Sequence, residues 1–150
     1  MLHMDKTDRE ILRLLNSNGR ATASEISRSI HLSIPAAAER IRKLDEAGVN
    51  ENYTVRISRQ KADWNIMAFI HVSVDDTENI ANFRTEITRY PCVLECHHVA
   101  GTYDYLLKVL TENMAALDFF LSNSLKAIQG VSSSNTTIVL STFKETLNPF

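Results

Sequence analysis

Residues 22–47, TASEISRSIHLSIPAAAERIRKLDEA, contain two short helical patterns that meet across a four-residue turn. Thr22 stands three residues before Glu25, so each side chain can bind a free backbone amide at the start of a helix. Ser33, with Pro35 in the following turn, begins the second pattern in a similar way. The stretch therefore predicts a helix-turn-helix.

The second helix of this pair has an apolar side and a polar side. At helical spacing the apolar stripe holds Ile34, Ala37, Ile41 and Leu44. The opposite side carries Pro35, Ala36, Glu39, Arg42, Lys43 and Glu46, with Arg40 on its flank. Such a face fits a groove of DNA. It also fits an ordinary solvated helix, because Glu39 can pair with Arg42 and Lys43 along the same helix.

The residues on either side complete a small domain. Asp5 and Asp8 predict the start of a first helix, and Gly19 predicts its end. The apolar face of this helix can pack under the helical pair as a three-helix core. That face consists of Ile11, Leu12, Leu14 and Leu15. After Gly48, alternation of apolar and polar residues predicts a strand that serves as a wing or as an arm to another subunit; its apolar positions are Val49, Tyr53, Val55 and Ile57.

Composition narrows the class of protein. The 150 residues carry a formal charge of −2, which gives no general affinity for polyanions. Residues 1–60 hold ten basic and eight acidic side chains, whereas residues 61–150 hold six and ten, as suits a nucleic-acid module joined to another domain. Neither a membrane-length apolar run nor an apolar leader is found, so we expect a cytoplasmic protein with no membrane partner.

The second half predicts six elements in a regular order. They are a strand (Met67–Asp75), a helix (Thr77–Tyr90), two strands (Cys92–Val99 and Tyr103–Thr111), a helix (Asn113–Ile128) and a last strand (Ser133–Phe143). The helices rest on Ile80, Phe83, Ile87 and Tyr90, and on Leu117, Leu121, Ser124, Leu125 and Ile128. This βαββαβ order is the ferredoxin-like fold. Neither face of the first strand is fully polar, so we expect a second copy of the chain to cover the sheet.

Three stretches make the chain resemble the Lrp/AsnC, or feast/famine, family of transcription regulators. They are MDKTDREILRLLNSNGR at residues 4–20, LSIPAAAERIRKLDEAGV at 32–49 and GTYDYLLKV at 101–109. The resemblance implies an α+β protein with a winged helix-turn-helix, residues 1–60, and a ferredoxin-like RAM domain, residues 61–150. It also implies a homodimer built through the RAM sheet, further assembly to tetramers or octamers, and binding of double-stranded DNA and of free amino acids between RAM domains.

The sequence departs from the family pattern at three places. Asn50, Glu51 and Asn52 follow the second helix of the pair, where relatives commonly have a hydrophobic residue and a glycine. Ala62, Asp63 and Trp64 stand where relatives usually carry a glycine before the first RAM strand. Ala37 replaces a frequent valine. A different wing or linker and a thinner three-helix core are therefore expected.

DNA recognition is expected to divide between phosphate and base contacts. Arg28, Arg40, Arg42 and Lys43, with Arg56 or Arg59 from the strand, can neutralise phosphates. The start of the helix offers small groups and one carboxylate for base edges, namely Ser33, Pro35, Ala36, Ala38 and Glu39. Because no Asn, Gln or Arg is placed there for a bidentate base contact, we expect relaxed, shape-dependent recognition of A·T-rich sites.

The effector site is predicted around Gly101 and Asp104. A glycine between strands lets a ligand approach the backbone, and a carboxylate can take an ammonium group. From the residues alone, a simple hairpin turn with a surface acid is the favoured interpretation. The resemblance matches Gly101, Thr102, Tyr103 and Asp104 to the family's effector loop, Met114 to a nearby pocket position, and Thr136, Thr137 and Ile138 to a wall across the interface. Aliphatic lining by Met114 and Ile138 suits leucine or methionine.

Other chemistries are weaker fits. Cys92, Cys96 and His98 would share one face of a strand but span about 20 Å, so one tetrahedral metal ion could take at most two neighbours among them plus a residue of another strand, such as His71. Buried cysteines and a hydrogen-bonded histidine are the commoner outcome. A cysteine beside His97 points to the opposite face, so nucleophilic catalysis is not expected, and neither is a cofactor. Two alternatives to a ligand-responsive regulator remain: a DNA architectural protein without a ligand, and an enzyme or small-molecule carrier on the ferredoxin-like half.

Overall fold

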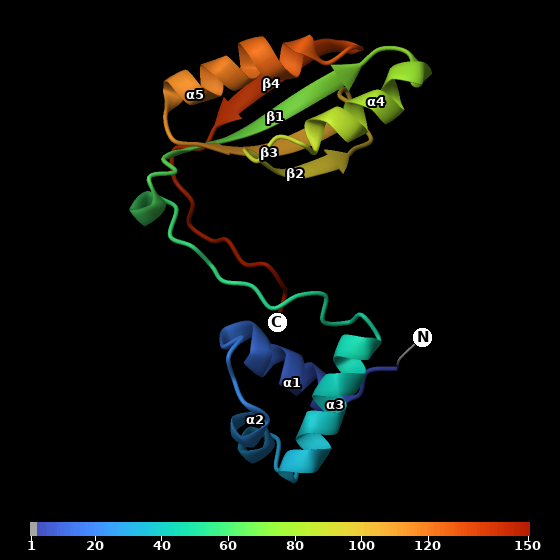
Figure 1. Ribbon diagram of the computed structural model, residues 1–150, viewed down its shortest axis with the longest axis vertical. Helices are drawn as coiled ribbons and strands as arrows, with labels where there is room; N and C mark the ends of the chain where they lie inside the picture. Colours follow the sequence, from blue (N-terminus) through green and yellow to red (C-terminus); the bar gives the residue numbers. More distant parts are fainter. Residues whose placement is uncertain (1–2) are drawn as a thin grey trace. The chain divides into compact units, whose positions relative to one another are not determined.

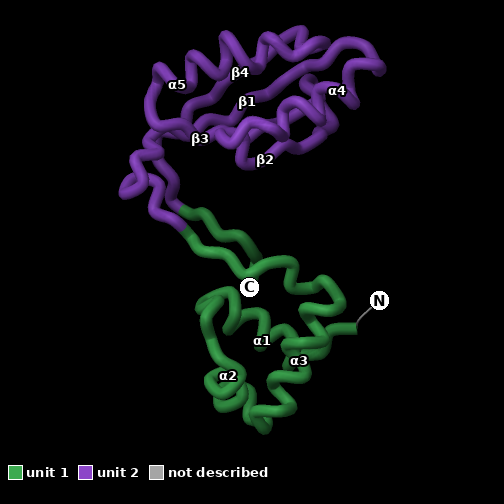
Figure 2. Tube along the Cα trace, in the orientation of Figure 1, with its two compact units in different colours: residues 1–56, 144–150 green, residues 57–143 purple. Residues whose placement is uncertain are grey.

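The computed structural model describes residues 3–150, which form two compact units. Unit 1 holds the described chain up to Arg56 together with residues 144–150, and unit 2 is residues 57–143 (Figure 2). The two units are therefore joined by the chain twice, once after residue 56 and once after residue 143. The predicted boundary after residue 60 differs from this division by a few residues and leaves out the return of the C-terminal segment.

Unit 1 contains three helices, each begun by the cap that its sequence offers (Figure 1). The helices are α1 (Lys6–Ser17), α2 (Ala23–Ser29) and α3 (Ile34–Glu46). Asp5 with Asp8, and Thr22 with Glu25, form reciprocal capping boxes, while the Ser33 hydroxyl accepts a hydrogen bond from the Ala36 amide at 3.4 Å. These side chains satisfy amides that the first helical turn leaves unpaired. The helix-turn-helix is thus formed as its local sequence predicts.

The three helices enclose one apolar core. Its buried members are Ile11, Leu12, Leu15, Ile26, Ala37 and Leu44, with Ile30 and Ile41 packed against them. Ala37 is fully buried, so the core accommodates the smaller residue at this position. Ile34, which the periodicity placed on the apolar stripe, is instead 52% exposed at the first turn of α3. That expectation was wrong, since Ile34 is not among the residues that pack against this core.

The strand predicted over residues 49–57 does not form. Residues 51–58 have no regular secondary structure, and the described part of unit 1 contains helices only. Tyr53, Val55 and Ile57 are 49, 67 and 67% exposed, respectively. A strand requires a hydrogen-bonding neighbour, and alternating sequence cannot supply one. The predicted wing is therefore an extended segment in this chain.

Unit 2 is a four-stranded antiparallel sheet with helices packed on one face (Figure 1). Its elements are η1 (Gln60–Ala62), β1 (Ile66–Val74), α4 (Thr77–Ile87), β2 (Val93–His98), β3 (Tyr105–Thr111), α5 (Met114–Phe119), η2 (Phe120–Ser124), η3 (Leu125–Ala127) and β4 (Val131–Ile138). The strand order is β2-β3-β1-β4. This arrangement confirms the predicted α+β class and βαββαβ order.

The second helix of unit 2 is less regular than predicted. After α5 the chain makes a π turn, η2, and then the 3₁₀ turn η3, instead of continuing as one α-helix to Ile128. A π turn lengthens the step between buried positions, so Leu125 follows Phe120 into the core at a spacing of five. Phe120 is 3% exposed and was missed by a strict 3.6-residue period.

The segment before β1 explains one departure from the family pattern. Asp63 ends η1 with φ of 60°, in the left-handed region that favours glycine. Aspartate tolerates this conformation better than most residues, because its short polar side chain can bond locally. Where a glycine was expected, this chain thus has an aspartate in the left-handed conformation.

The last strand ends earlier than predicted, and the chain then returns to unit 1. β4 stops at Ile138 rather than Phe143. In unit 1, the Asn148 amide donates to the Asn16 side chain at 3.1 Å, and Asn16 donates to the Phe150 carbonyl at 3.4 Å. Arg56 lies 3.8 Å from the Glu145 carboxylate. The C-terminal segment is therefore attached to the end of α1 and to the extended segment.

The second face of the sheet carries mixed side chains and no helix. Strand register aligns them in two rows: His97, Leu106, His71 and Asn135, and then Glu95, Lys108, Phe69 and Thr137. Glu95 accepts hydrogen bonds from Lys108 and His97, both at 3.1 Å. The helix-covered face is fully apolar in β1, where Ala68, Ile70 and Val72 are completely buried. The two faces thus differ as the alternation in β1 predicts.

Candidate functional site

The outer side of α3 is the first candidate surface. Ser33, Ile34, Pro35, Ala38 and Glu39 are exposed along its N-terminal half, and Ala36 is partly buried. The same helix buries Ala37 and Leu44 in the core, which fixes which side faces outward. The buried face anchors α3 in the core, and the predicted polar face is therefore exposed to solvent.

Ion pairs occupy the basic groups of this surface. Arg42 donates to both oxygens of Glu39 at 2.7 and 2.8 Å and to Glu46 four residues on, and Lys43 lies 3.7 Å from Glu39. The Arg42 guanidinium lowers the pKa of the Glu39 carboxyl, and the two glutamates raise the pKa of Arg42. The face is therefore balanced in charge, and phosphate would have to compete with Glu39 and Glu46.

Arg28 and Arg40 have different surroundings from Arg42. Arg28 is exposed and donates to the Ser24 hydroxyl at 3.3 Å, which leaves most of its donors facing solvent. Arg40 is only partly exposed and donates to Asp8 at 2.7 Å and to Asp5 at 2.9 Å. Arg28 is therefore more available to bind a phosphate than Arg40, although both were expected to do so.

The two arginines of the extended segment lie beside the C-terminal segment. Arg56 pairs with Glu145 in unit 1. In unit 2, Arg59 donates to the Thr142 hydroxyl at 3.2 Å and contacts the Met67 sulfur at 2.9 Å. Both side chains thus hold chain segments together within their own unit.

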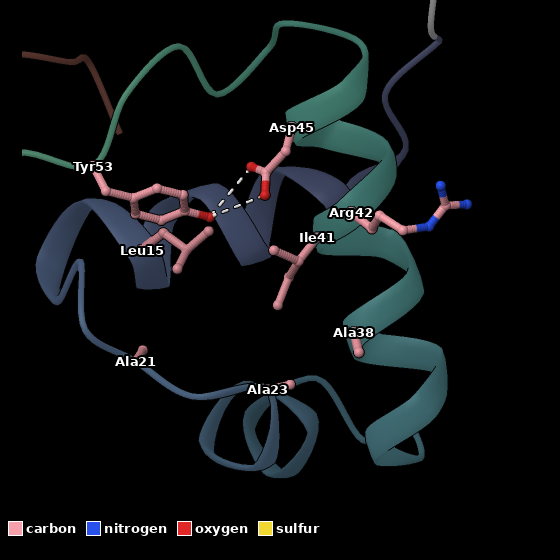
Figure 3. Close-up of a pocket in the computed structure, with 8 residues that line it drawn as sticks. All are labelled: Leu15, Ala21, Ala23, Ala38, Ile41, Arg42, Asp45 and Tyr53. Atoms are coloured by element: carbon pink, nitrogen blue, oxygen red, sulfur yellow. Dashed lines mark hydrogen bonds between the residues drawn. The ribbon is translucent and has the colours of Figure 1, made fainter.

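A hollow of about 350 Å³ opens on unit 1 (Figure 3). It is lined by Leu15, Ala21, Ala23, Ala38, Ile41, Arg42, Asp45 and Tyr53. The Tyr53 hydroxyl donates to Asp45 at 3.2 Å, and Asn50 donates to the same carboxylate at 2.8 Å. Burial, followed by the Asp45 charge, raises the pKa of Tyr53. Asn50 and Tyr53 thus hold the residues after α3 against that helix.

Figure 3 also shows that Arg42 extends away from this hollow. Its guanidinium therefore belongs to the outer surface of α3, while only the base of its side chain lines the hollow.

The loop between β2 and β3 is the second candidate site. Backbone bonds close it at its base, from the Val99 amide to the Asp104 carbonyl at 2.9 Å and from the Asp104 amide to the Val72 carbonyl at 3.0 Å. Asp104 Oδ2 accepts from the Val74 amide at 2.9 Å. The carboxylate thus ties the loop to β1 through one of its two oxygens.

Gly101 lies at the exposed part of this loop. A Cβ atom added to Gly101 would meet nothing within 4 Å, and its φ is not in the left-handed region. The backbone of one chain therefore does not require glycine here. A required left-handed conformation therefore does not explain the glycine at this turn. Tyr103 beside it packs on His71, with ring centroids 5.2 Å apart.

The remaining predicted effector residues do not meet this loop within one chain. Residues 101–104 precede Tyr105, which pairs with Val72, whereas Met114 follows Thr111, which pairs with Ile66 at the other end of β3. These ends are about 20 Å apart at strand spacing. Thr136 and Ile138 pair with Ile70 and Ala68, between the two ends. A single pocket that uses all eight residues therefore requires more than one chain.

Met114 and Ile138 are nonetheless available as apolar contacts. Their side chains are 51 and 38% exposed. Thr137, by contrast, points to the helix-free face of the sheet beside Phe69, while Thr136 lies on the opposite face. The three consecutive predicted residues of β4 thus contribute to different faces.

The cysteine and histidine residues in and just before β2 were the candidate metal ligands. No group of three or more potential metal ligands occurs among the described residues 3–150. Cys92 and Cys96 are free and partly buried, and burial raises the pKa of both thiols. His98 packs on Tyr105 at 5.2 Å between ring centroids. In the same described part of the chain, no helix has the length and apolar character needed to cross a membrane.

Sequence reasoning missed two features of these sites. It did not identify the pairing of Arg40 with Asp5 and Asp8, for which charge complementarity across more than thirty residues gives no local signal. It also did not include Asn50 and Tyr53 as partners of Asp45, although all three lie within nine residues and are polar.

Comparison with known proteins covers nearly the whole chain. Residues 4–45 match the AsnC-type helix-turn-helix domain, and residues 67–149 match the Lrp/AsnC ligand binding domain. An HTH-type transcriptional regulator of Bacillus subtilis, YezC, is 38% identical over 122 residues, which are 81% of this chain and 86% of that protein.

Two solved structures are similar over the same extent. A transcriptional regulator of Neisseria meningitidis, in complex with L-methionine, has a TM-score of 0.94 and 32% identity and covers 97% of this chain and 95% of its own. A feast or famine regulatory protein of M. tuberculosis, also complexed with L-methionine, has a TM-score of 0.88 and 29% identity over 95% of this chain and 96% of its own. The fold and the division into two kinds of domain are thus shared with these regulators.

Proposed function

This chain belongs to the Lrp/AsnC family and is a transcriptional regulator with a helix-turn-helix domain and a ligand-binding domain, not an enzyme. From that premise we propose that it binds double-stranded DNA through α3, as a homodimer or larger assembly, and that an aliphatic amino acid alters this binding. Its place of action is then the cytoplasm, where bacterial and archaeal DNA lies. The observation that carries the proposal is the exposed N-terminal half of α3, held by a buried opposite face.

The proposed DNA surface combines small groups with a few charged ones. Ser33, Pro35 and Ala36 begin α3, and they can approach base edges and thymine methyl groups. Arg28, Arg42 and Lys43 supply phosphate contacts, and Glu39 can accept from a base once Arg42 turns to a phosphate. Because few groups read bases directly, binding should depend strongly on salt and on DNA shape.

The proposed effector is L-methionine or a similar aliphatic amino acid. Support comes from two relatives that bind L-methionine and from the exposed apolar side chains of Met114 and Ile138. Asp104 would take the ammonium group, and the loop of Gly101, Thr102 and Tyr103 would lie against the ligand. Because the loop and Met114 lie at opposite ends of β3, the pocket would combine residues from neighbouring subunits.

The proposed dimer uses the helix-free face of the sheet. Phe69, His71 and Leu106 are only partly buried there. A second copy would remove these side chains from water, which favours association. Such pairing would present two α3 helices to one DNA molecule, and half-sites about 34 Å apart would fit two successive major grooves on one side of the duplex.

DNA binding is tested by a gel-shift titration of the full chain against an A·T-rich duplex and a G·C-rich duplex, at several salt concentrations. The expected result is tighter binding to the A·T-rich duplex and a steep fall in affinity with salt. Binding to neither duplex at low salt would contradict the proposed DNA-binding function. A selected motif with several fixed guanines would contradict the shape-dependent recognition.

Effector binding is tested by thermal unfolding in the presence of each of the twenty amino acids. A ligand that binds only the native state raises the unfolding temperature, so L-methionine is expected to do so, with leucine as the next candidate. No shift with any amino acid, together with salt-dependent DNA binding, would favour a DNA architectural protein without a ligand.

A further inference from the structure

Arg40 of α3 is bound to the start of α1. Its Nη1 atom lies 2.7 Å from Asp8 Oδ1 and 2.9 Å from Asp5 Oδ2. The Asp8 side chain is 12% exposed, the Arg40 side chain 35% and the Asp5 side chain 49%. One nitrogen thus bridges two carboxylates that lie more than thirty residues earlier in the chain.

Each of the four carboxylate oxygens in this cluster accepts a hydrogen bond. Asp5 Oδ1 accepts from the Asp8 amide at 2.8 Å, and Asp8 Oδ2 accepts from the Asp5 amide at 3.0 Å, which completes the capping box of α1. The other two oxygens are those that receive Arg40. The capping box alone would leave two negative charges at adjacent turns, and Arg40 compensates them. The same carboxylates therefore begin α1 and attach α3 to it.

Arg42 also pairs with two carboxylates, but they belong to its own helix and not to α1. It pairs only with Glu39 and Glu46 of its own helix, and its side chain is 53% exposed. Exchange of these carboxylates for a phosphate would move no helix. Pairs of this kind within a helix contribute little to folding, whereas the Arg40 pairs join two helices. The two arginines, two residues apart on α3, thus differ in what their loss would disturb.

We propose that Arg40 is a positioning residue, which holds α3 on the capping box of α1, and that it makes no phosphate contact when the protein binds DNA. Phosphate contacts on α3 then fall to Arg42 and Lys43. This assignment rests on the proposed DNA-binding function and names which of its basic residues touch the ligand.

The first test compares R40Q with R42Q in the full chain, with DNA affinity measured from low to high salt and with thermal unfolding. Loss of one phosphate contact lowers the slope of log affinity against log salt by about 0.9. We expect this change for R42Q, with an unfolding temperature close to that of the unchanged protein. For R40Q we expect an unchanged slope, weaker binding by the same factor at every salt concentration, and an unfolding temperature lower by about 4–8 °C.

The second test uses D8N, which keeps an oxygen for the Asp5 amide but removes the charge that Arg40 binds. If Arg40 contacted phosphate, its release from Asp8 would tighten DNA binding. If Arg40 is a positioning residue, D8N should instead bind DNA more weakly and unfold at a lower temperature. The double variant R40Q/D8N should unfold close to the temperature of R40Q, because R40Q already removes the interaction that D8N removes. D8N also serves if R40Q does not fold.

The outcomes separate the two proposals. A salt slope that falls for R40Q as it does for R42Q, or tighter binding by D8N, would overturn the positioning role. Additive losses of unfolding temperature in the double variant would also overturn it. Failure of the unchanged protein to bind DNA would instead contradict the proposed function, while the unfolding measurements would still decide whether Arg40 holds α3 on α1.

Discussion

Single residues of similar type have different tasks in this chain according to what surrounds them. Asp104 is a clear case, since one of its carboxylate oxygens accepts from the Val74 amide while the residue itself remains exposed. The same side chain thus supports the loop between β2 and β3 and offers charge at its surface. A substitution that removes both functions would mix their effects.

At this scale we predict the effect of Asp104→Asn on the effector response. Asparagine keeps an oxygen for the Val74 amide but removes the charge that an ammonium group requires. The unfolding temperature should stay near that of the unchanged protein, and the rise caused by L-methionine should be lost, with DNA affinity unaltered. Asp118→Asn, on the exposed side of α5, is the control. A full response to L-methionine in Asp104→Asn would remove Asp104 from the binding site.

A second residue-scale prediction concerns Gly130. Its φ is +91°, and an added Cβ atom would lie 2.4 Å from the Cβ atom of Asn79 in α4. This neighbour is the rigid base of a side chain, so Gly130→Ala should destabilise the protein by about 1–3 kcal/mol beyond the cost of the backbone conformation. Gly48→Ala is the matched control, because φ is +66° but nothing lies within 4 Å. Denaturant unfolding measures both, and equal losses would contradict the steric argument.

At the scale of elements, helix starts are the features most directly set by local sequence. The capping boxes of α1 and α2 and the Ser33 cap of α3 each lie within four residues, and all three were predicted. Features that need a distant partner were not. Residues 51–58 alternate like a strand but pair with no neighbouring strand, and the bridge from Arg40 to Asp5 and Asp8 joins residues more than thirty positions apart.

The same division holds in the ligand-binding half. The order of strands and helices followed from alternation and period, whereas the π turn after Phe119 did not, because it depends on how Phe120 and Leu125 pack on the sheet. The candidate loop was located by its sequence, but its distance from Met114 follows from the register of β3 with β1. Sequence thus selected the candidate residues without showing that one chain keeps them apart.

We predict that the helix caps make unit 1 sensitive to acid. Hydrogen bonds from the Thr22 amide and then from the Thr22 hydroxyl lower the pKa of Glu25. The Asp8 amide, followed by Arg40, lowers the pKa of Asp5. In both cases burial acts in the opposite direction and raises the pKa. A carboxyl with a lowered folded-state pKa adds stability above its unfolded value, and this stability is lost as pH falls through the folded value. The unfolding temperature should therefore drop below about pH 4.5.

Glu25→Gln tests this dependence. Glutamine keeps an acceptor for the Thr22 amide but does not titrate, so its unfolding temperature should be lower at neutral pH and should change less with acid. Glu78→Gln, which removes a carboxylate outside unit 1, is the control. An unchanged acid dependence in Glu25→Gln would show that this cap is not among the groups that titrate on unfolding.

For the whole molecule, the proposal that the helix-free face of the sheet forms the subunit contact can be tested by substitution. Phe69 lies in a row between Lys108 and Thr137 on this face. Phe69→Glu would place a charge at the centre of the proposed dimer contact, and desolvation of that charge should shift the protein to monomers in light scattering. Asn123→Glu, an exposed residue on the helix side, should leave the mass unchanged. A dimer that persists in Phe69→Glu would place the subunit contact on another surface.

The return of residues 144–150 to α1 bears on how the protein is made. A ribosome releases the three helices of unit 1 first, then all of unit 2, and only then the segment with Glu145 and Asn148. The half of the chain that is synthesised earliest is therefore completed last. A nascent polypeptide stalled after β4 would already carry both folded halves, yet it would lack the final contacts at the end of α1.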